Sequence, residues 1–218
     1  MKKKFNKTKV HDISIPLRRE MPTYEGEPGP TLEFLKSKAN GDQANCSVLS
    51  LGSHTGTHID APSHFLDGGA SVDGLALSAF VGPARVVEYS GRGHITAADL
   101  KALGVPADRE RILFKTRNSG LWNDLEFRRD FCAVAPDAAR ELASRRLKLV
   151  GIDYLSIEPF GAEIPDTHTT LLSSGCVVLE GIDLRDIQPG TYFLVCAPLN
   201  VVGAEGAPTR AILIEDLA

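Results

Sequence analysis

The stretch His54-Thr55-Gly56-Thr57-His58-Ile59-Asp60-Ala61-Pro62-Ser63-His64 carries three of the chain's six histidines, together with a carboxylate. Its ionisable side chains all stand at even-numbered positions, namely His54, His58, Asp60 and His64. Successive side chains of an extended chain point to opposite faces, so these four would share one face. An extended or gently coiled segment that presents three imidazoles and a carboxylate on one side predicts a metal site.

The backbone of this stretch is expected to bend. Gly56 and Pro62 both disfavour an α-helix. A straight strand would hold the Cα atoms of His54 and His58 about 13 Å apart, at roughly 3.3 Å per residue, which is too far for one ion to be shared. We therefore expect a bend at Gly56, because glycine adopts backbone angles that other residues avoid.

Imidazole and carboxylate groups are typical ligands of zinc, and manganese or iron are also compatible with them. His54, His58 and Asp60 supply three ligands, which leaves a coordination position open to water, as in catalytic sites. Each histidine alone would more commonly be a surface residue or a hydrogen-bonded core residue. Their combination on one face favours metal binding.

A second candidate group lies downstream. Glu180 ends an apolar run, 176–179, where a carboxylate is costly unless it is paired or bound to metal. Read alone, Glu180 could contact solvent at a strand end and His168 could be an ordinary loop residue. Beside a first metal site, both become candidate ligands of a second ion, with the two oxygens of Asp60 as the bridge.

Two neighbouring ions would lower the pKa of a bound water towards about 7 and stabilise the oxyanion formed when that water attacks a carbonyl. A leaving nitrogen also needs a proton from a general acid. His64 fits this role, since it lies on the same face and is not required as a ligand. These parts indicate hydrolysis of an amide, and they would equally serve an ester or lactone.

The bulk composition is that of one globular domain. A chain of 218 residues with 43% hydrophobic residues can bury one substantial core. We expect a flexible tail over residues 1–9 and a single hydrolase domain over 10–218. The net charge of −4 does not indicate nucleic-acid binding, which requires a basic surface. No apolar run approaches the roughly 20 residues that are needed to cross a membrane. The lack of a signal peptide and the scattered cysteines (Cys46, Cys132, Cys176 and Cys196) lead us to expect free thiols in a cytoplasmic protein.

The hydrophobic pattern predicts an α/β fold with a mixed β-sheet core and few helices. The expected strands are 10–15, 46–51, 84–89, 111–115, 148–152, 176–179, 192–196 and 211–214. One helix should follow Thr96, which begins a capping box, and end at Gly104. A second should run from Pro136 to about Arg146. Long irregular stretches at 16–31, 66–81 and 159–170 flank the candidate ligands, and we expect them to wall the site.

The segment from His54 to Phe65, HTGTHIDAPSHF, resembles the signature of the metal-dependent cyclase family, which includes bacterial kynurenine formamidases and isatin hydrolases. The resemblance extends to His168 and Glu180, to residues 151–156 and to the tail at 197–211. It implies a swivelling β/β/α-type single domain, a homo-oligomer such as a dimer, and hydrolysis of a small non-peptide amide. It also implies two divalent ions, zinc or alternatively manganese. His54, His58 and Asp60 would hold the first ion, Asp60, His168 and Glu180 the second, and His64 would transfer protons.

The resemblance makes an arylformamidase with an N-formylkynurenine-type substrate the leading expectation. Tyr24 stands where the formamidases carry a tryptophan, and Phe65 and Trp122 are further candidates for the pocket, with core packing as their alternative role. One alternative function is ring opening of a cyclic amide such as isatin. Another is a non-catalytic module with a structural metal, which the six candidate residues argue against because a closed zinc site needs four ligands.

Overall fold

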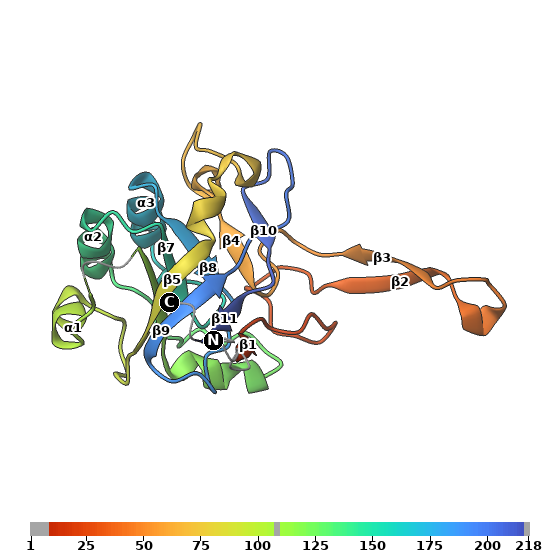
Figure 1. Ribbon diagram of the computed structural model, residues 1–218, viewed down its shortest axis with the longest axis horizontal. Coiled ribbons are helices and arrows are strands. Elements are labelled where there is room, and N and C mark those ends of the chain that lie inside the picture. The colour runs from red at the N-terminus through yellow and green to blue at the C-terminus, as the bar shows by residue number, and fades with distance from the viewer. Residues whose placement is uncertain (1–8, 107–109, 216–218) are drawn as a thin grey trace, which may run out of the picture.

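The structure is a computed structural model that describes residues 9–106 and 110–215. It is a single α/β domain around one curled mixed sheet, with a two-stranded arm projecting from it (Figure 1). The strands are β1 (Val10–Asp12), β2 (Thr31–Lys36), β3 (Cys46–Ser50), β4 (His58–Asp60), β5 (Val81–Glu88), β6 (Arg111–Lys115), β7 (Leu149–Ile152), β8 (Val177–Glu180), β9 (Gly190–Val195), β10 (Gly206–Pro208) and β11 (Ile212–Ile214). The helices are α1 (Ala97–Ala102), α2 (Pro136–Ser144) and α3 (Asp166–Ser173). Short 3-10 helices span Lys38–Asn40, Pro62–His64, Val72–Gly74, Leu77–Ala79 and Arg117–Asn123.

The main sheet has the strand order β1-β11-β9-β5-β6-β7-β8-β4-β10. Its centre, from β5 to β8, is parallel, and the flanking strands are antiparallel. β6, β7 and β8 are buried along almost their whole length, as expected for parallel strands covered on both faces. The expected mixed sheet with few helices is therefore confirmed.

Successive side chains of the central strands pack alternately into two hydrophobic cores, one on each face of the sheet. Ile112 and Phe114 of β6 pack with the helices α1, α2 and α3, whereas Leu113 between them packs with the other face of the sheet. This period of two follows from the pleat of the strands. Figure 1 shows the three helices together on one side of the sheet, and β4 and β10 at the opposite end.

The two predicted helices begin where their sequence signals placed them. Thr96 caps α1, because its side chain accepts a hydrogen bond from the Asp99 backbone while the Asp99 side chain accepts one from Thr96. Gly104 follows with a positive φ of 60°. Pro136 is the first residue of α2. Predicted and observed strand ends differ by up to three residues, with β1 ending at Asp12 rather than at residue 15.

Three elements were missed by the sequence analysis. The stretch 159–170 contains the start of α3, so His168 lies on a helix and not in a loop. β2 begins within what was expected to be irregular chain, and β10 pairs with β4 near the C-terminus. The expected tail at residues 1–9 lies, except for residue 9, outside the described residues.

Cys46 is exposed, and Cys132, Cys176 and Cys196 are buried free thiols. Burial raises the pKa of Cys176 to about 12, so this thiol stays protonated and unreactive. Within the described ranges, no helix is long and apolar enough to cross a membrane.

Candidate functional site

The candidate site forms at the β4 edge of the sheet, where the 54–64 stretch meets β8. The backbone register places His58 of β4 directly opposite Glu180 of β8, and Asp60 two residues further along the same face. This pairing explains how residues more than a hundred positions apart in sequence come into contact. Within 54–64 only residues 58–60 are in a strand, and residues 62–64 form a short 3-10 helix that was not predicted.

A turn at Gly56, with φ of 70°, folds His54 back onto the strand, which confirms the expected bend. Gly181 comes so close to this turn that a Cβ atom there would lie 1.9 Å from the carbonyl oxygen of Gly56. Thr57 links the turn to two other segments. Its hydroxyl donates a hydrogen bond to the Gly181 carbonyl and accepts one from the Ile15 amide. The chain reverses again at Pro62, which begins the short 3-10 helix that carries His64.

Buried Asp153 holds together the segments next to the Glu180 strand by hydrogen bonds. Its carboxylate accepts hydrogen bonds from the backbone amides and hydroxyls of Thr116 and Ser119, at 2.7–3.1 Å. The next residue, Tyr154, accepts a hydrogen bond of 2.8 Å from the Gly181 amide. Although these hydrogen bonds favour the ionised form, burial raises the pKa of Asp153.

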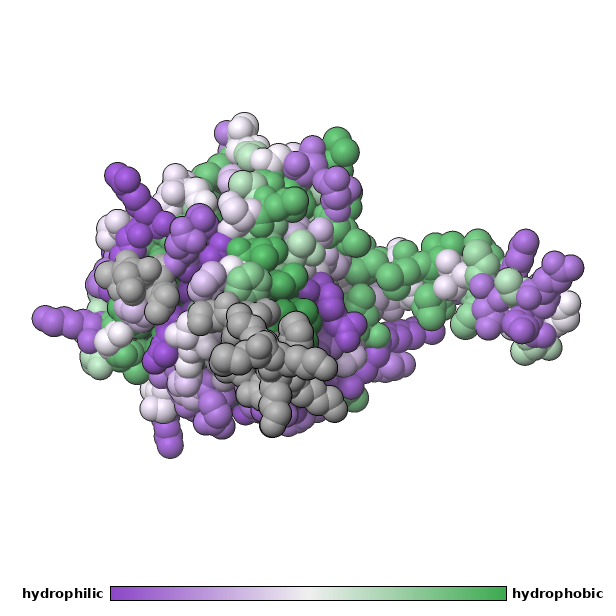
Figure 2. Space-filling model, in the orientation of Figure 1, coloured by the Kyte–Doolittle hydropathy of each residue, from purple (hydrophilic) through white to green (hydrophobic). Residues whose placement is uncertain are grey.

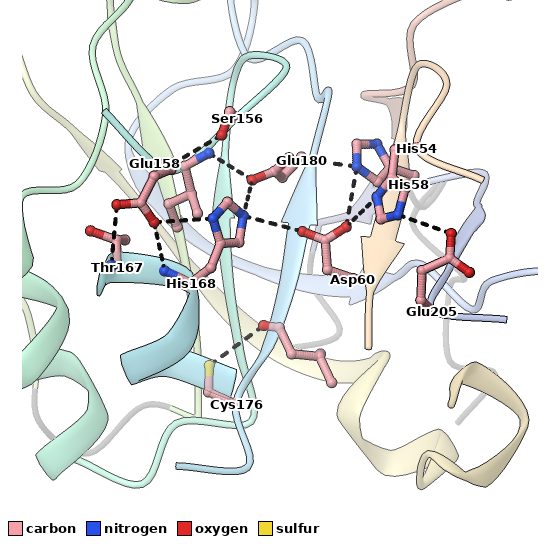
Figure 3. Close-up of polar contacts among 12 residues, drawn as sticks. His54, His58, Asp60, Ser156, Glu158, Thr167, His168, Cys176, Glu180 and Glu205 are labelled. Atoms are coloured by element: carbon pink, nitrogen blue, oxygen red, sulfur yellow. Dashed lines mark hydrogen bonds and ion pairs between the residues drawn. The ribbon is translucent and has the colours of Figure 1, made fainter. Parts of the chain in front are cut away.

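Asp60 lies between two groups of ligand-type side chains (Figure 3). Its Oδ1 atom is 2.8 Å from Nδ1 of His54 and 3.3 Å from Nε2 of His58. Its Oδ2 atom is 3.4 Å from Nε2 of His168, which is 3.1 Å from Oε1 of Glu180. Each oxygen of Asp60 therefore serves one group, and the structure brings all five sequence-predicted ligands together.

The electrostatics of this cluster favour a cation. Burial alone would lower the pKa of His58, yet the adjacent Asp60 and Glu180 carboxylates raise it to about 10. Burial would likewise lower the pKa of His168, but carboxylates including Asp60 and Glu158 raise it well above its usual value. Burial would raise the pKa of Asp60, but the imidazoles of His168, His54 and His58 hold it well below its usual range.

The residues also fit divalent ions by geometry. Ligands at about 2.0–2.2 Å from a tetrahedral zinc lie roughly 3.3–3.5 Å from one another, which is close to the separations measured around Asp60. Among the described residues, Nε2 of His58 and Oδ2 of Asp60 are buried without a hydrogen-bond partner. Nδ1 of His58 donates to the Gly56 carbonyl, so Nε2 is the nitrogen that would give up its proton to bind a metal ion. His54, His58 and Asp60 would hold one ion, and Asp60, His168 and Glu180 another.

Two further carboxylates, which the sequence analysis missed, lie beside the candidate ligands. Glu158 is 3.2 Å from Nδ1 of His168 and also accepts hydrogen bonds from the first turn of α3. Glu205 lies 3.5 Å from Nε2 of His54, on the side of the ring away from Asp60. A carboxylate hydrogen-bonded as Glu158 is fixes the tautomer of a metal-binding histidine, whereas Glu205 makes no hydrogen bond to His54. Neither residue has a spacing or pattern that could have singled it out.

His64 lies beside the ligands without belonging to either group. Its ring stacks on that of His54, with 4.0 Å between centroids. Burial lowers the pKa of His64 to about 4, so the imidazole is neutral at neutral pH.

Four of the five candidate ligands, namely His54, His58, His168 and Glu180, line a cavity of about 480 Å³, whereas Asp60 is fully buried among them and does not line it. Tyr24 and Phe65 line it, as predicted, and Phe65 stacks on His168 at 4.6 Å between centroids. Phe160 completes an apolar wall with Tyr24. Two of the three long stretches, 16–31 and 159–170, contribute lining residues, whereas 66–81 contributes none.

Trp122 does not line the cavity. Its side chain is buried, its Nε1 donates to the carbonyl of Ile182, and its ring packs 5.2 Å from that of Tyr154. The residue therefore has the alternative, packing role, because the 117–123 turn directs the indole into the core.

The fold and this ligand set are those of a single-domain protein with a mixed sheet and a candidate divalent-metal site. Residues 11–159 match the family model Cyclase, described as "Putative cyclase". The chain belongs to the Cyclase family.

Relatives agree with this assignment. The chain is 39% identical to cyclase-like protein 1 of Arabidopsis thaliana over 95% of its own length and 85% of the relative. It is 38% identical to kynurenine formamidase of Salinibacter ruber over 81% of its own length and 84% of the relative.

Solved structures share the fold. A predicted metal-dependent hydrolase from Bacillus stearothermophilus superposes with a TM-score of 0.82 at 37% identity, covering 96% of this chain and 99% of that one. Isatin hydrolase A from Labrenzia aggregata has the same fold, with a TM-score of 0.82 at 22% identity, covering 95% and 93% of the two chains.

Proposed function

We propose that the protein is a binuclear amidohydrolase that cleaves a small non-peptide amide, and that its substrate is an arylformamide of the N-formylkynurenine type. The observation that carries this proposal is the position of buried Asp60, whose two oxygens face two separate ligand groups, and the histidines and Glu180 of these groups line one cavity. The kynurenine formamidase relative, at 38% identity, supports the substrate class.

A divalent ion bound by these residues, zinc in the first place and manganese as the alternative, would lower the pKa of a bound water and polarise the amide carbonyl. His64 handles the proton. Its imidazole lies against the ring of His54 and would accept the proton that the attacking water loses and then donate it to the leaving nitrogen. This transfer lets the amine depart as a neutral group while the formyl carbon becomes formate.

The cavity suits an aryl substrate in size and lining. A volume of about 480 Å³ falls within the range of roughly 300–1,000 Å³ typical of small-molecule sites. Tyr24, Phe65 and Phe160 offer ring faces on which an aryl group can stack. The ligand groups supply the polar end of the same cavity, where the amide carbonyl would be held.

Ring opening of a cyclic amide is the second candidate. It requires the same attack on a carbonyl and the same proton delivery to nitrogen, and the chain shares its fold with isatin hydrolase A. The two reactions differ in whether the leaving nitrogen remains attached to the product.

A substrate panel tests the proposal. The zinc-loaded and the manganese-loaded protein are each given N-formylkynurenine, isatin and a simple cyclic imide, and kcat/KM is measured for each. We expect N-formylkynurenine to have the highest value, and Asp60→Asn to abolish its turnover. A higher value for isatin would favour ring opening, and no turnover of any compound by protein shown to hold metal would contradict the hydrolase proposal.

A further inference from the structure

Tyr24 belongs to the segment 13–30, which joins β1 to the two-stranded arm of β2 and β3. The arm exposes hydrophobic residues along its strands (Figure 2), whereas the segment before it turns apolar side chains inward. Met21 is buried, and the half-buried ring of Tyr24 packs against the same hydrophobic cluster. Tyr24 thereby reaches the wall of the cavity that the candidate ligands line.

The ring of Tyr24 is held in place by contacts on its apolar side. It packs against Phe127 with 5.0 Å between ring centroids, and against Phe160 with 6.3 Å. Arg129 connects the two chain segments that form this wall, because its guanidinium pairs with Glu25 and lies over the Phe160 ring at 5.3 Å. These contacts fix the direction of the Tyr24 ring before a substrate enters, which reduces the entropy lost on binding.

The hydroxyl of Tyr24 is the end of the side chain that remains unpaired. The hydroxyls of the other three tyrosines each bond the backbone, namely Tyr89 to the His94 carbonyl, Tyr154 to the Arg128 amide and Tyr192 to the Gln188 carbonyl. Over residues 9–106 and 110–215, no protein group bonds the hydroxyl of Tyr24. A binding cavity typically has a few polar groups that fix the orientation of its ligand. The Tyr24 hydroxyl is free to be one of them.

This hydroxyl lies towards the candidate ligands. Burial raises the pKa of Tyr24, and the Glu180 carboxylate is the next largest cause of the rise. Nearby charges act on a pKa in this way, so the hydroxyl is placed between the aromatic wall and the ligand groups. An aryl ring stacked on that wall, with its amide at the ligand groups, would bring the ring position beside the amide next to the hydroxyl.

We propose that Tyr24 is a specificity-determining residue, whose hydroxyl donates a hydrogen bond to a ketone oxygen at the ring position ortho to the scissile amide. The inference rests on the proposed function and names the feature of the aryl substrate that this chain selects. A ketone oxygen has two lone pairs, so it can accept from Tyr24 and from the amide N–H on its own ring. N-formylkynurenine has a ketone at this position. The ketone of isatin stands in the same relation to the ring nitrogen, so the inference applies to both candidate reactions.

Two isomeric substrates test the inference on the metal-loaded protein. Both ortho-acetylformanilide and para-acetylformanilide carry a ketone that activates the leaving amine, but only the ortho ketone can reach Tyr24. We expect Tyr24→Phe to lower kcat/KM for the ortho isomer about tenfold or more, and that for the para isomer less than about threefold, the scale of one lost hydrogen bond. Tyr192→Phe is the matched control, because it removes a hydroxyl outside the cavity, and it should change neither value. Equal losses for the two isomers, or no loss for the ortho isomer, would overturn the inference.

Binding of the product amines separates this inference from the proposed hydrolysis. Isothermal titration calorimetry measures the Kd of ortho-aminoacetophenone and of para-aminoacetophenone. We expect Tyr24→Phe to raise the Kd of the ortho amine about tenfold and to leave that of the para amine unchanged. This difference in a wild-type protein that hydrolyses neither formamide would contradict the hydrolase proposal and support the role of Tyr24. The same Kd of the ortho amine for both proteins would overturn the inference, even where both formamides are hydrolysed.

Discussion

Gly206 provides a way to displace one candidate metal ligand while leaving the backbone unchanged. Gly206 lies in β10 opposite Asp60, and a Cβ atom there would come within 2.5 Å of Cε1 and 2.9 Å of Nε2 of His54. Carbon atoms in contact prefer about 3.5–4.0 Å, so Gly206→Ala should push the ring by roughly 1 Å. The backbone of Gly206 does not have a positive φ, and alanine is therefore compatible with it.

Metal sites hold their ligand distances to within about 0.2 Å, so a displacement of this size should weaken metal binding. We expect Gly206→Ala to lower metal affinity at least tenfold, and kcat/KM for the preferred substrate about a hundredfold. Affinity is measured by competition with a chromophoric chelator. The free energy of unfolding of the metal-free protein should change by less than about 1 kcal/mol.

Gly93→Ala is the matched control, because no atom lies within 4 Å of a Cβ at this exposed position. It should leave both affinity and turnover unchanged. If Gly206→Ala bound metal as tightly as wild type, His54 would not hold an ion in the conformation described here, and the assignment of the first ligand group would be refuted.

Three further predictions concern neighbouring residues. His64→Ala should retain bound metal and lose about a hundredfold in kcat; unchanged kcat would remove His64 from proton transfer. Glu158→Ala removes the acceptor of the His168 imidazole, so metal affinity should fall roughly 10–100-fold in the same chelator assay, and an unaltered affinity would contradict the orienting role. Gly181→Ala should lower the free energy of unfolding by more than about 1–2 kcal/mol in urea titrations, because φ is 70° and Gly56 leaves no room; wild-type stability would disprove the close approach.

The sequence predicted the ligands better than it predicted the shape that holds them. His54, His58 and Asp60 were found through alternation in an extended chain, yet only 58–60 form a strand. These side chains converge because the chain turns at Gly56. The turn was predictable, since a straight strand cannot bring His54 and His58 to one ion. The pairing of β4 with β8, which delivers Glu180, is a long-range contact that a short motif does not encode.

Helix α3 and Glu158 show why other features could not be predicted. Residues 166–173 contain three threonines, which are poor helix formers, so the helix depends on packing of Leu171 and Leu172 against the sheet. The role of Glu158 exists only once α3 is in place, because its carboxylate accepts from the first turn of that helix. Trp122 was misjudged for a related reason. It lies in a polar loop of the sequence, but its side chain packs in the hydrophobic core.

The sharing of Asp60 by two ions is the central claim, and the metal content of purified protein tests it most directly. Elemental analysis should find two divalent ions per chain in the wild type and a loss of both in Asp60→Asn, because each ligand group depends on one oxygen of this carboxylate. A single ion per chain that survives Asp60→Asn would contradict the claim.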